Sequence, residues 1–346
     1  MSIAEPLHAP SPAFAPPDPA LSHTVLGTGI GVPPTVVGND ALTAGLDTND
    51  AWIRSRTGIR ERRFLEPERT TSDLCVEAAQ QALRSSGLTP ADLDAVVVAT
   101  MTPDQPIPST ALLVMDAIGA HRALPLDLNQ GACAGGVLAL HTGASLLRSP
   151  EIRHVLVIGA DVMSRITDPA DRTTRVFFGD AAGAVVLGRS DVPGYGILAW
   201  DFETALDHSV EIRAGGSALP ASGDTVDRGE HYLRMDGKAV WKRATDMLPR
   251  SIRSAVARAG VDLDDVRHFV LHQANRNIVE HVLDTLGAER HRACVTVDWL
   301  GNTSAASVFT VLHEVVMAKK IQRDDVFVVS GIGAGFICGS LVIRYG

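Results

Sequence analysis

Continuous apolar runs alternate with amphipathic stretches along most of the chain. The runs "DAVVVAT" (Asp94–Thr100) and "HVLVIGADV" (His154–Val162) carry apolar side chains at successive positions, which is typical of strands covered on both faces. Between such runs, "TSDLCVEAAQQALRSSG" opens with Thr and Ser, places its apolar residues at helical spacing and closes on Gly87, so it predicts a helix. This alternation predicts an α/β fold.

Four segments of the first half have counterparts in the second half, in the same order. The first segment is typical of a strand followed by a polar turn, and the second of a strand, a turn of small residues and a helix. The third and fourth segments are typical of strands. The pairs are 94–104 with 267–277, 125–140 with 295–312, 154–162 with 325–333, and 182–189 with 338–345. Such repetition indicates a duplicated fold.

We place the two halves at residues 23–200 and 201–346, with a Gly/Ser/Asp-rich boundary region from about Thr204 to Gly229. The first 22 residues are rich in Pro and Ala and predict a flexible tail. They lack the basic start and continuous apolar stretch of a signal peptide. The first half also holds an extra stretch, Met163–Asp180, of the kind that often carries function.

Composition argues against several classes of protein function. Of 346 residues, 45% are hydrophobic and 21% charged, with a net charge of −9, which argues against a general nucleic-acid binder. No apolar run is long enough to cross a membrane. The four cysteines are scattered without metal-type spacing, so we expect free thiols, a cytoplasmic location and no metal site.

Cys133 stands between small residues, in "LDLNQGACAGGVLAL" (Leu126–Leu140), where a strand-like run becomes a helix-like run. At the start of a helix, the dipole favours thiolate over thiol. Small neighbours let a substrate approach and leave backbone N–H groups for an oxyanion. The turn by itself fits a catalytic thiol and a buried core cysteine equally well.

Two further strand ends carry polar side chains that could serve such a thiol. His272 follows a strand in "FVLHQANRNI", and Asn302 lies in the turn "GNTS". Taken singly, His272 is better explained as a hydrogen-bonded structural histidine, and Asn302 as a turn former. If the halves are duplicated, however, Cys133 and Asn302 occupy equivalent turns that meet near one centre, and the joint pattern predicts a catalytic site.

The motifs "DLNQGACAGG", "LHQAN", "GNTSAAS" and "GIGAGFICGSLVIRYG" resemble those of β-ketoacyl-[acyl-carrier-protein] synthase III of the thiolase superfamily. This resemblance, from about His23 to Gly346, implies a homodimer of five-layered αβαβα subunits. It also implies that an acyl group passes from acyl-CoA to the cysteine and condenses with malonyl-carrier protein in a decarboxylating Claisen reaction, in fatty acid or polyketide initiation. No metal or redox cofactor is implied, since the CoA thioester is a substrate.

By position, the resemblance makes Cys133 the nucleophile and lets His272 and Asn302 bind the thioester oxygen. The acyl oxyanion would lie on the backbone N–H groups of Cys133 and Ala334. For acyl-CoA, the implied binding residues are Trp52 and Arg172 around the adenine and Arg56 at the phosphates. Two further residues implied in substrate binding are Ile107, at a pocket-lining position, and Phe178. For carrier-protein docking they are Lys238, Lys242, Arg243 and Arg276, which as charges alone would be read as a solvated face.

The chain departs from the family pattern at three places. Asn277 replaces an arginine commonly used in docking, Gly136 replaces a bulky residue, and Ile337–Cys338 replaces a polar-aromatic pair. We expect the last two changes to alter the acyl pocket.

Four other functions fit less well. "GTGIG" (Gly27–Gly31) partly matches a dinucleotide loop, but prolines follow it. A degradative thiolase would need a second catalytic cysteine where Ser330 stands. A family member that moves acyl groups onto a hydroxyl or amine often lacks the asparagine that Asn302 supplies, and a non-catalytic partner subunit would lack Cys133.

Overall fold

The computed structural model describes residues 22–129 and 131–346, and it contains two principal β-sheets. The first has the order β1 (His23–Gly31), β7 (Asp180–Arg189), β6 (His154–Val162), β4 (Ala95–Ala99), β5 (Leu124–Leu128). The second has the order β8 (Gly196–Thr204), β13 (Ile337–Arg344), β12 (Val326–Gly333), β11 (Val266–Leu271).

The two sheets repeat one pattern of strand directions. In the first, β6 runs parallel to β4 and antiparallel to β7, which is antiparallel to β1. In the second, β12 runs parallel to β11 and antiparallel to β13, which is antiparallel to β8. The predicted duplication is therefore confirmed by topology.

The predicted strand at residue 295 is wrong. The segment forms the short helix α10 (Val297–Leu300), and the counterpart of β5 is reduced to one bridge between Phe269 and Ala293. The side-chain oxygen of Gln273 accepts hydrogen bonds from the N–H groups of Thr296 (3.0 Å) and Val297 (3.3 Å). These backbone donors are thus used in a turn rather than in a strand ladder.

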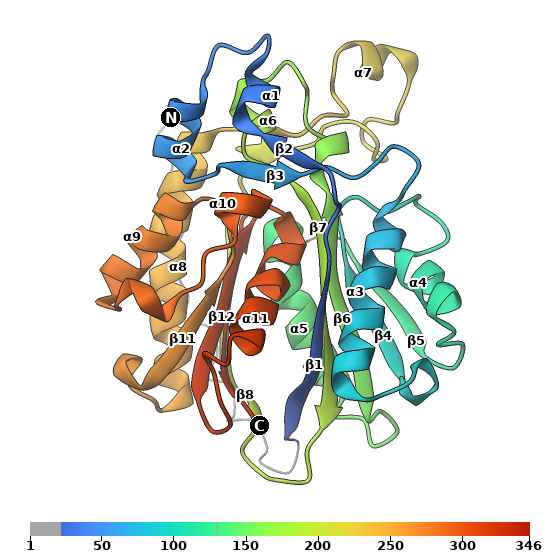
Figure 1. Cartoon of the computed structure of the whole chain (residues 1–346), viewed down its shortest axis with the longest axis vertical. Helices are drawn as coiled ribbons and strands as arrows, with labels where there is room; N and C mark the ends of the chain where they lie inside the picture. The colour runs from blue at the N-terminus through green and yellow to red at the C-terminus, as the bar shows by residue number, and fades with distance from the viewer. Residues whose placement is uncertain (1–21, 130) are drawn as a thin grey trace.

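Six helices complete the five layers, which Figure 1 shows nearly edge-on. Helices α3 (Thr71–Ser86) and α4 (Thr110–Ile118) cover the outer face of the first sheet, and α8 (Gly237–Ala259) and α9 (Arg276–Leu286) lie outside the second. Helices α5 (Gly135–Leu146) and α11 (Ser307–Met317) lie between the sheets. The αβαβα architecture is as predicted.

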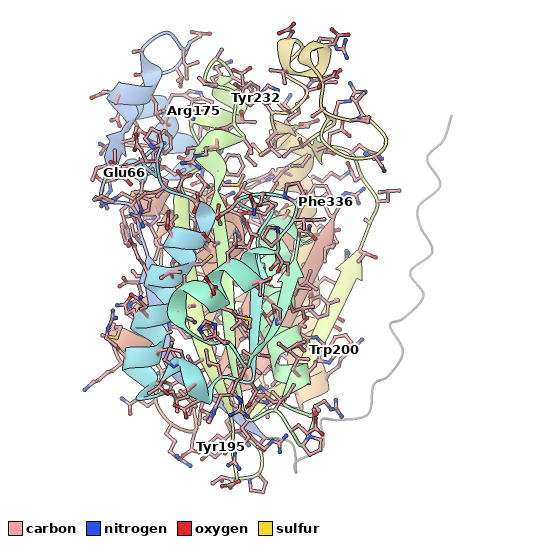
Figure 2. All side chains as sticks on the ribbon, turned by 90° about the vertical axis from the view of Figure 1, so that its right-hand side faces the viewer. Glu66, Arg175, Tyr195, Trp200, Tyr232 and Phe336 are labelled. Carbon is pink, nitrogen blue, oxygen red and sulfur yellow. The ribbon has the colours of Figure 1, made fainter. Side chains whose placement is uncertain are left out.

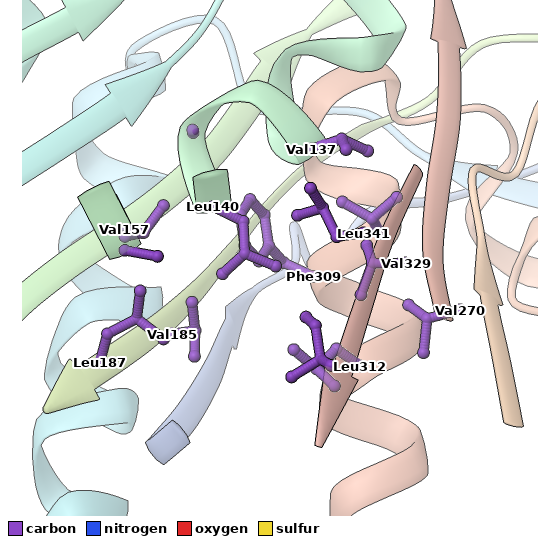
Figure 3. Packing of buried hydrophobic residues seen from close by; sticks show 14 of the residues in the cluster. Val137, Leu140, Val157, Val185, Leu187, Val270, Phe309, Leu312, Val329 and Leu341 are labelled. Atoms are coloured by element: carbon purple, nitrogen blue, oxygen red, sulfur yellow. The ribbon is translucent and has the colours of Figure 1, made fainter. Parts of the chain in front are cut away.

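The central core joins both halves. Val137 and Leu140 of α5 and Phe309 and Leu312 of α11 pack with strand residues of both sheets (Figure 3). The two helices approach closely because Gly136 has no side chain: a Cβ there would lie 2.6 Å from the Val308 Cγ2 of α11 and 2.5 Å from the carbonyl oxygen of Ala305, just before that helix. This close crossing brings the starts of the two helices together.

Glycines also let α3 lie directly against β1. Cβ atoms at Gly27, Gly29 and Gly31 would collide with backbone carbonyls of α3. The sequence "GTGIG" is therefore part of a strand packed under a helix and not a turn that leads from a strand into a helix.

The remaining elements are short, and several form the upper end of the molecule in Figure 1. They are β2 (Val36–Gly38), α1 (Asn39–Thr43), α2 (Asp50–Thr57), β3 (Glu61–Arg63), η2 (Pro90–Asp92), η3 (Ala132–Ala134), η4 (Met163–Arg165), α6 (Arg172–Arg175), β9 (Val210–Glu211), α7 (Gly223–Asp227), β10 (Arg234–Met235), η5 (Leu263–Asp265), η6 (Arg290–Arg292) and η7 (Ser304–Ala306). No helix within the described residues has the length and apolarity to span a membrane.

Two predicted boundaries change. The boundary at residue 200 falls inside β8, so the chain passes from one sheet to the other between Arg189 and Gly196. The predicted tail, residues 1–22, lies outside the described residues except for Ser22, which is buried and accepts a hydrogen bond from the Gly194 N–H (2.7 Å).

Candidate active site

Cys133 lies in the single-turn helix η3, between β5 and the central helix α5, as the sequence predicted. The residue before it, Ala132, has a φ of 42°, in the left-handed region that non-glycine residues rarely adopt. The turn before α11 has the same feature, since Ser304 has a φ of 50°. Two equivalent strained turns thus meet where the central helices begin.

Asn302 and Ser304 both contact the nucleophile. Hydrogen bonding from both side chains lowers the pKa of the Cys133 thiol. The Asn302 Oδ1 accepts from the Ser304 N–H (2.9 Å), so the amide NH₂ is the end that remains for the sulfur. The Asn302 backbone is held by Phe177 O (2.8 Å) and Gly179 N (3.1 Å).

His272 follows β11 and is almost fully buried. Its N–H donates to Ser330 O (2.8 Å), and its Nδ1 lies 2.6 Å from the Ser307 Oγ. His272 and the nucleophile both lie beside Gly331: a Cβ there would lie 3.3 Å from the His272 Cβ and 3.6 Å from the Cys133 carbonyl oxygen. The structure therefore brings Cys133, His272 and Asn302 together.

Ala334 is adjacent to the nucleophile's backbone. A Cβ on Gly333, the residue before it, would lie 3.1 Å from the Cys133 N. Phe336, two residues further on, lies in the upper half of the molecule, away from the end that carries Tyr195 (Figure 2). The small-residue run thus passes directly beside Cys133, where the predicted oxyanion donors would need to be.

The ionisation of Cys133 differs from the sequence expectation. Burial is the main cause that raises the pKa of the thiol to about 11; the nearby Asp161 carboxylate acts in the same direction, and hydrogen bonding by Ser304 and Asn302 acts against it. The expected preference for thiolate at the helix start is therefore wrong for the resting protein, because desolvation outweighs the favourable contacts. Burial also lowers the pKa of His272 to about 3, so the ring is neutral near pH 7.

Three residues around this centre were missed. Ser304 and Ser307 were considered only as small residues of "GNTSAAS". Asp161, the one acid in the apolar run of β6, was not singled out. Its Oδ1 accepts from Met101 N (2.8 Å) and its Oδ2 from Ala305 N (3.1 Å), so it ties the loop after β4 to η7. A lone acid inside an apolar strand was the available signal.

The two predicted pocket residues have different environments. Phe178 is buried with Met163 and Leu233, and its backbone bridges Asn302, so it lies beside the centre. Ile107 is 86% exposed in the loop before α4 and is not part of the buried surroundings of Cys133 within one chain.

The two side chains that the sequence predicts at the adenine, Trp52 and Arg172, lie close together. The Arg172 guanidinium carbon lies 5.8 Å from the centroid of the Trp52 ring, and its NH1 donates to Asp47 O (3.1 Å). Trp52 and Arg56 are both exposed on α2, the latter in its last turn. An indole and a guanidinium plane facing one another suit a flat aromatic ligand.

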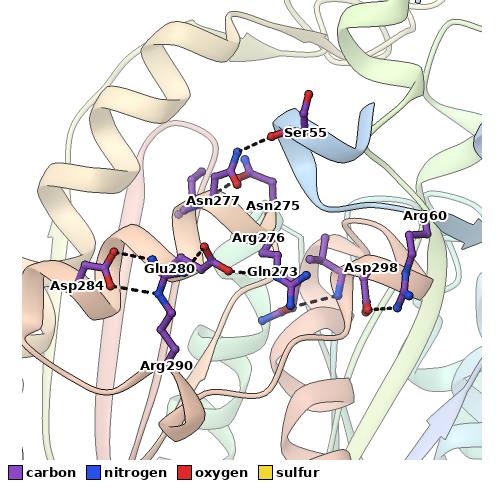
Figure 4. Close-up of polar contacts among 12 residues, drawn as sticks. Ser55, Arg60, Gln273, Asn275, Arg276, Asn277, Glu280, Asp284, Arg290 and Asp298 are labelled. Atoms are coloured by element: carbon purple, nitrogen blue, oxygen red, sulfur yellow. Dashed lines mark hydrogen bonds and ion pairs between the residues drawn. The ribbon is translucent and has the colours of Figure 1, made fainter. Parts of the chain in front are cut away.

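Asn277, which departs from the family pattern, has a structural role here. Its amide donates to the carbonyls of Ser55 (3.3 Å) and Arg56 (2.8 Å) at the end of α2 (Figure 4). It therefore joins α9 to the helix that carries Trp52.

Two of the four predicted docking cations are paired. Arg276 pairs with Glu280 (3.3 Å) and Arg243 with Asp207 (3.2 Å). Arg290 also neutralises Glu280 and Asp284, so this surface of α9 has little net charge (Figure 4). Lys238 and Lys242, both exposed on α8, take part in no ion pair among the described residues.

The other two departures are placed in packed interior. Gly136 faces Ala305 and the start of α11, and Cys338 is buried in β13. The missing side chain of Gly136 allows close packing against the start of α11, and its effect on the acyl pocket stays a prediction.

The chain matches family models at two places. The model described as 3-oxoacyl-[acyl-carrier-protein (ACP)] synthase III matches residues 126–205, and the C-terminal model of the same family matches residues 256–345. The beta-ketoacyl-[acyl-carrier-protein] synthase III of Natranaerobius thermophilus is 37% identical over 325 residues, which cover 93% of this chain and 98% of that one. That of Symbiobacterium thermophilum is 39% identical over 324 residues, covering 93% and 98%.

Solved structures agree with these matches. The 3-oxoacyl-[acyl-carrier-protein] synthase III from Aquifex aeolicus VF5 has a TM-score of 0.85 at 35% identity, covering 94% of this chain and 100% of that one. The priming β-ketosynthase of the R1128 polyketide pathway also has a TM-score of 0.85, at 34% identity, covering 94% and 96%.

Proposed function

Because the chain belongs to the 3-oxoacyl-[acyl-carrier-protein] synthase III family, we propose that it starts acyl chains by decarboxylative condensation, in fatty acid or polyketide synthesis. The observation that carries this proposal is the meeting of a nucleophilic thiol with two neutral donors, His272 and Asn302, at the starts of the central helices.

In the first half-reaction, the Cys133 sulfur attacks the carbonyl carbon of acyl-CoA. The bond to the CoA sulfur breaks, and the proton that leaves Cys133 ends on that sulfur, so no net proton is needed. The oxyanion formed in between accepts hydrogen bonds from the N–H groups of Cys133 and Ala334. Trp52, Arg172 and Arg56 hold the CoA, and Phe178 contacts the acyl chain.

In the second half-reaction, malonyl-carrier protein loses carbon dioxide. The electron pair of the broken C–C bond forms an enolate, whose oxygen accepts from the Asn302 amide and the His272 ring. Because burial keeps His272 neutral, it donates without protonating the carbanion as a strong acid would. The carbanion attacks the Cys133 thioester, the C–S bond breaks, and the sulfur takes a proton from solvent. The atoms and charges of the two half-reactions balance without a metal or redox group.

The direct test incubates the protein with acyl-CoA and malonyl-carrier protein and follows carbon dioxide and 3-ketoacyl product. We expect both to form, with the acyl group on Cys133 by intact-protein and peptide mass spectrometry. Acyl transfer to small alcohols or amines without carbon dioxide would instead identify an acyltransferase of the same family.

The carrier protein docks, in this proposal, at the start of α8. Lys238 and Lys242 lie four residues apart on this helix and are exposed, whereas Arg276 and Arg243 are neutralised by carboxylates. Acidic carrier proteins are attracted to such unpaired cations.

The edge of the first sheet supports a homodimer. Among the described residues strand β5 pairs only with β4, and three apolar side chains are exposed on β5, on α4 beside it and in the loop before α4: Leu124, Leu112 and Ile107. A two-fold axis would pair β5 with its own copy and cover these side chains. Ile107 would then lie against the second copy, which reconciles its exposure with the pocket-lining role that the sequence implied.

The free thiol of the nucleophile supports a cytoplasmic location, because all four cysteines are unpaired and the reaction requires Cys133 as a thiol.

A further inference from the structure

One short segment contacts both neutral donors of the site. Within it, the Ser304 N–H binds the Asn302 Oδ1 at 2.9 Å and so fixes which end of that amide faces the sulfur. Five residues after Asn302, the Ser307 Oγ lies 2.6 Å from the Nδ1 of His272. Ser307 is the first residue of α11, and the start of this helix places its hydroxyl beside the Nδ1 of the His272 ring.

The direction of the Ser307–His272 hydrogen bond follows from burial. Ser307 is fully buried, and in the described part of the chain its hydroxyl makes this one hydrogen bond. If Oγ accepted from an Nδ1–H, the single hydrogen of the hydroxyl would be buried without an acceptor. An unpaired buried hydrogen costs more than an unused lone pair, so Oγ–H donates to Nδ1.

A neutral imidazole carries one hydrogen. When Nδ1 accepts, that hydrogen lies on Nε2. The ring is neutral because it is buried: no charged group contributes to lowering its pKa. His272 therefore has a lone pair directed at Ser307 and a hydrogen on its other nitrogen.

We propose that Ser307 is a positioning residue that holds His272 in the tautomer with hydrogen on Nε2. The inference deepens the proposed function and rests on it, because this hydrogen is the one that forms the hydrogen bond to the enolate oxygen. Ser307 acts on the malonyl half-reaction through the ring, and the acyl-CoA half-reaction, whose oxyanion lies on backbone N–H groups, does not require it.

The tautomer can be read directly by ¹⁵N NMR of the full-length protein with labelled histidine. The His272 signals are assigned by their loss in His272→Gln. We expect an unprotonated Nδ1 and a protonated Nε2 at pH 7. A protonated Nδ1 would overturn the proposal. This measurement needs no malonyl substrate, so it stands even if the wild-type protein releases no carbon dioxide, a result that would defeat the proposed function alone.

The two half-reactions give the second readout. In Ser307→Ala, carbon dioxide release by the acylated protein should fall roughly tenfold or more, since the loss of an oriented oxyanion donor has effects of this order. Acylation of Cys133, followed by intact mass, should stay within about twofold. Ser307→Thr keeps the hydroxyl and should restore carbon dioxide release.

A matched control is Ser251→Ala. Ser251 is also fully buried, and its hydroxyl bonds the Ser340 Oγ (2.9 Å); among the described residues it makes no hydrogen bond to Cys133, His272 or Asn302. We expect both half-reactions to be unchanged in this variant. Equal losses of acylation and decarboxylation in Ser307→Ala, or no recovery in Ser307→Thr, would reduce Ser307 to a packing residue. If Ser307→Ala does not fold, the wild-type NMR result decides.

Discussion

At the scale of single residues, burial sets the charge states of the site. The charged forms of the Cys133 thiol and the His272 ring are both disfavoured away from water, so the pKa of the thiol rises to about 11 and the pKa of the ring falls to about 3. Both groups are neutral between these values. In the proposed reaction, the neutral thiol gives its proton to the leaving CoA sulfur, and the neutral ring donates a hydrogen bond to the enolate oxygen.

The thiol pKa predicts the pH dependence of alkylation. Below its pKa, the thiolate fraction of Cys133 rises about tenfold for each pH unit. The rate of iodoacetamide labelling at Cys133 should therefore increase steadily from pH 7 to pH 10, measured by peptide mass spectrometry. Cys133→Ser provides the background from the other thiols. A plateau below pH 8 would show that the thiol pKa is lowered, not raised.

Removal of the Asn302 amide should separate the two half-reactions. In Asn302→Ala, decarboxylation loses one of its two oxyanion donors and should slow by roughly 10²–10³. Acylation loses only a hydrogen bond that favours the thiolate and should slow less. Carbon dioxide release and intact mass measure the two rates. Equal losses would contradict the assigned role.

At the scale of elements, the site depends on two central helices that start beside one another. Each is preceded by a single-turn helix with one residue at positive φ, Ala132 or Ser304. The close packing of the helices behind these turns is permitted by Gly136, which has no Cβ to collide with Val308 of α11. Small residues after the nucleophile thus serve helix packing, in addition to any role in substrate access.

Gly136→Ala should therefore destabilise the fold. A Cβ at 2.5 Å from the Ala305 carbonyl oxygen and 2.6 Å from the Val308 Cγ2 forces α5 away from η7 and the start of α11. Overpacking of this kind costs roughly 1–3 kcal/mol, which should lower the midpoint of thermal unfolding by several degrees. Gly216→Ala is the control, because a Cβ at Gly216 would meet nothing within 4 Å. Unchanged stability in Gly136→Ala would show that the helices can separate at no cost.

At the scale of the whole molecule, charge and exposed apolar surface determine the partners. The chain carries a net charge of −9, so an acidic carrier protein meets overall repulsion and needs a local cationic surface. The ion pairs of α9 remove one candidate surface and leave the start of α8.

Charge reversal at Lys238 and Lys242 should test this surface. The double variant Lys238→Glu, Lys242→Glu should raise the KM for malonyl-carrier protein roughly tenfold, an effect that weakens at high salt, and leave acylation by acyl-CoA unchanged. Lys319→Glu, Lys320→Glu makes the same change in net charge after α11, and its KM should stay near the wild-type value. If both double variants raise KM equally, only net charge matters.

The edge strand predicts the oligomeric state. Wild-type protein should be a dimer by light scattering, and Leu112→Glu, Leu124→Lys should shift it toward monomer because both exposed side chains would enter the interface as charges. A wild-type monomer at working concentration, or a dimer that survives both substitutions, would exclude β5 as the contact.

The sequence by itself determined the α/β class, the duplication, and the placement of Cys133, His272 and Asn302 at turns beside strand ends or helix starts. These features follow from local apolar periodicity, turn chemistry and covalent order. Recognition of the family depended on the same short motifs, "GACAGG", "LHQAN" and "GNTSAAS".

Only the tertiary structure decided the ionisation of these groups and the orientation of their polar atoms. Ser307 meets His272 across 35 positions of the chain, and Asp161 reaches Ala305 across 144. The strand expected at residue 295 became a turn because Gln273 reached its N–H groups. Desolvation and hydrogen-bond partners depend on segments that are distant in sequence, and no local pattern contains them.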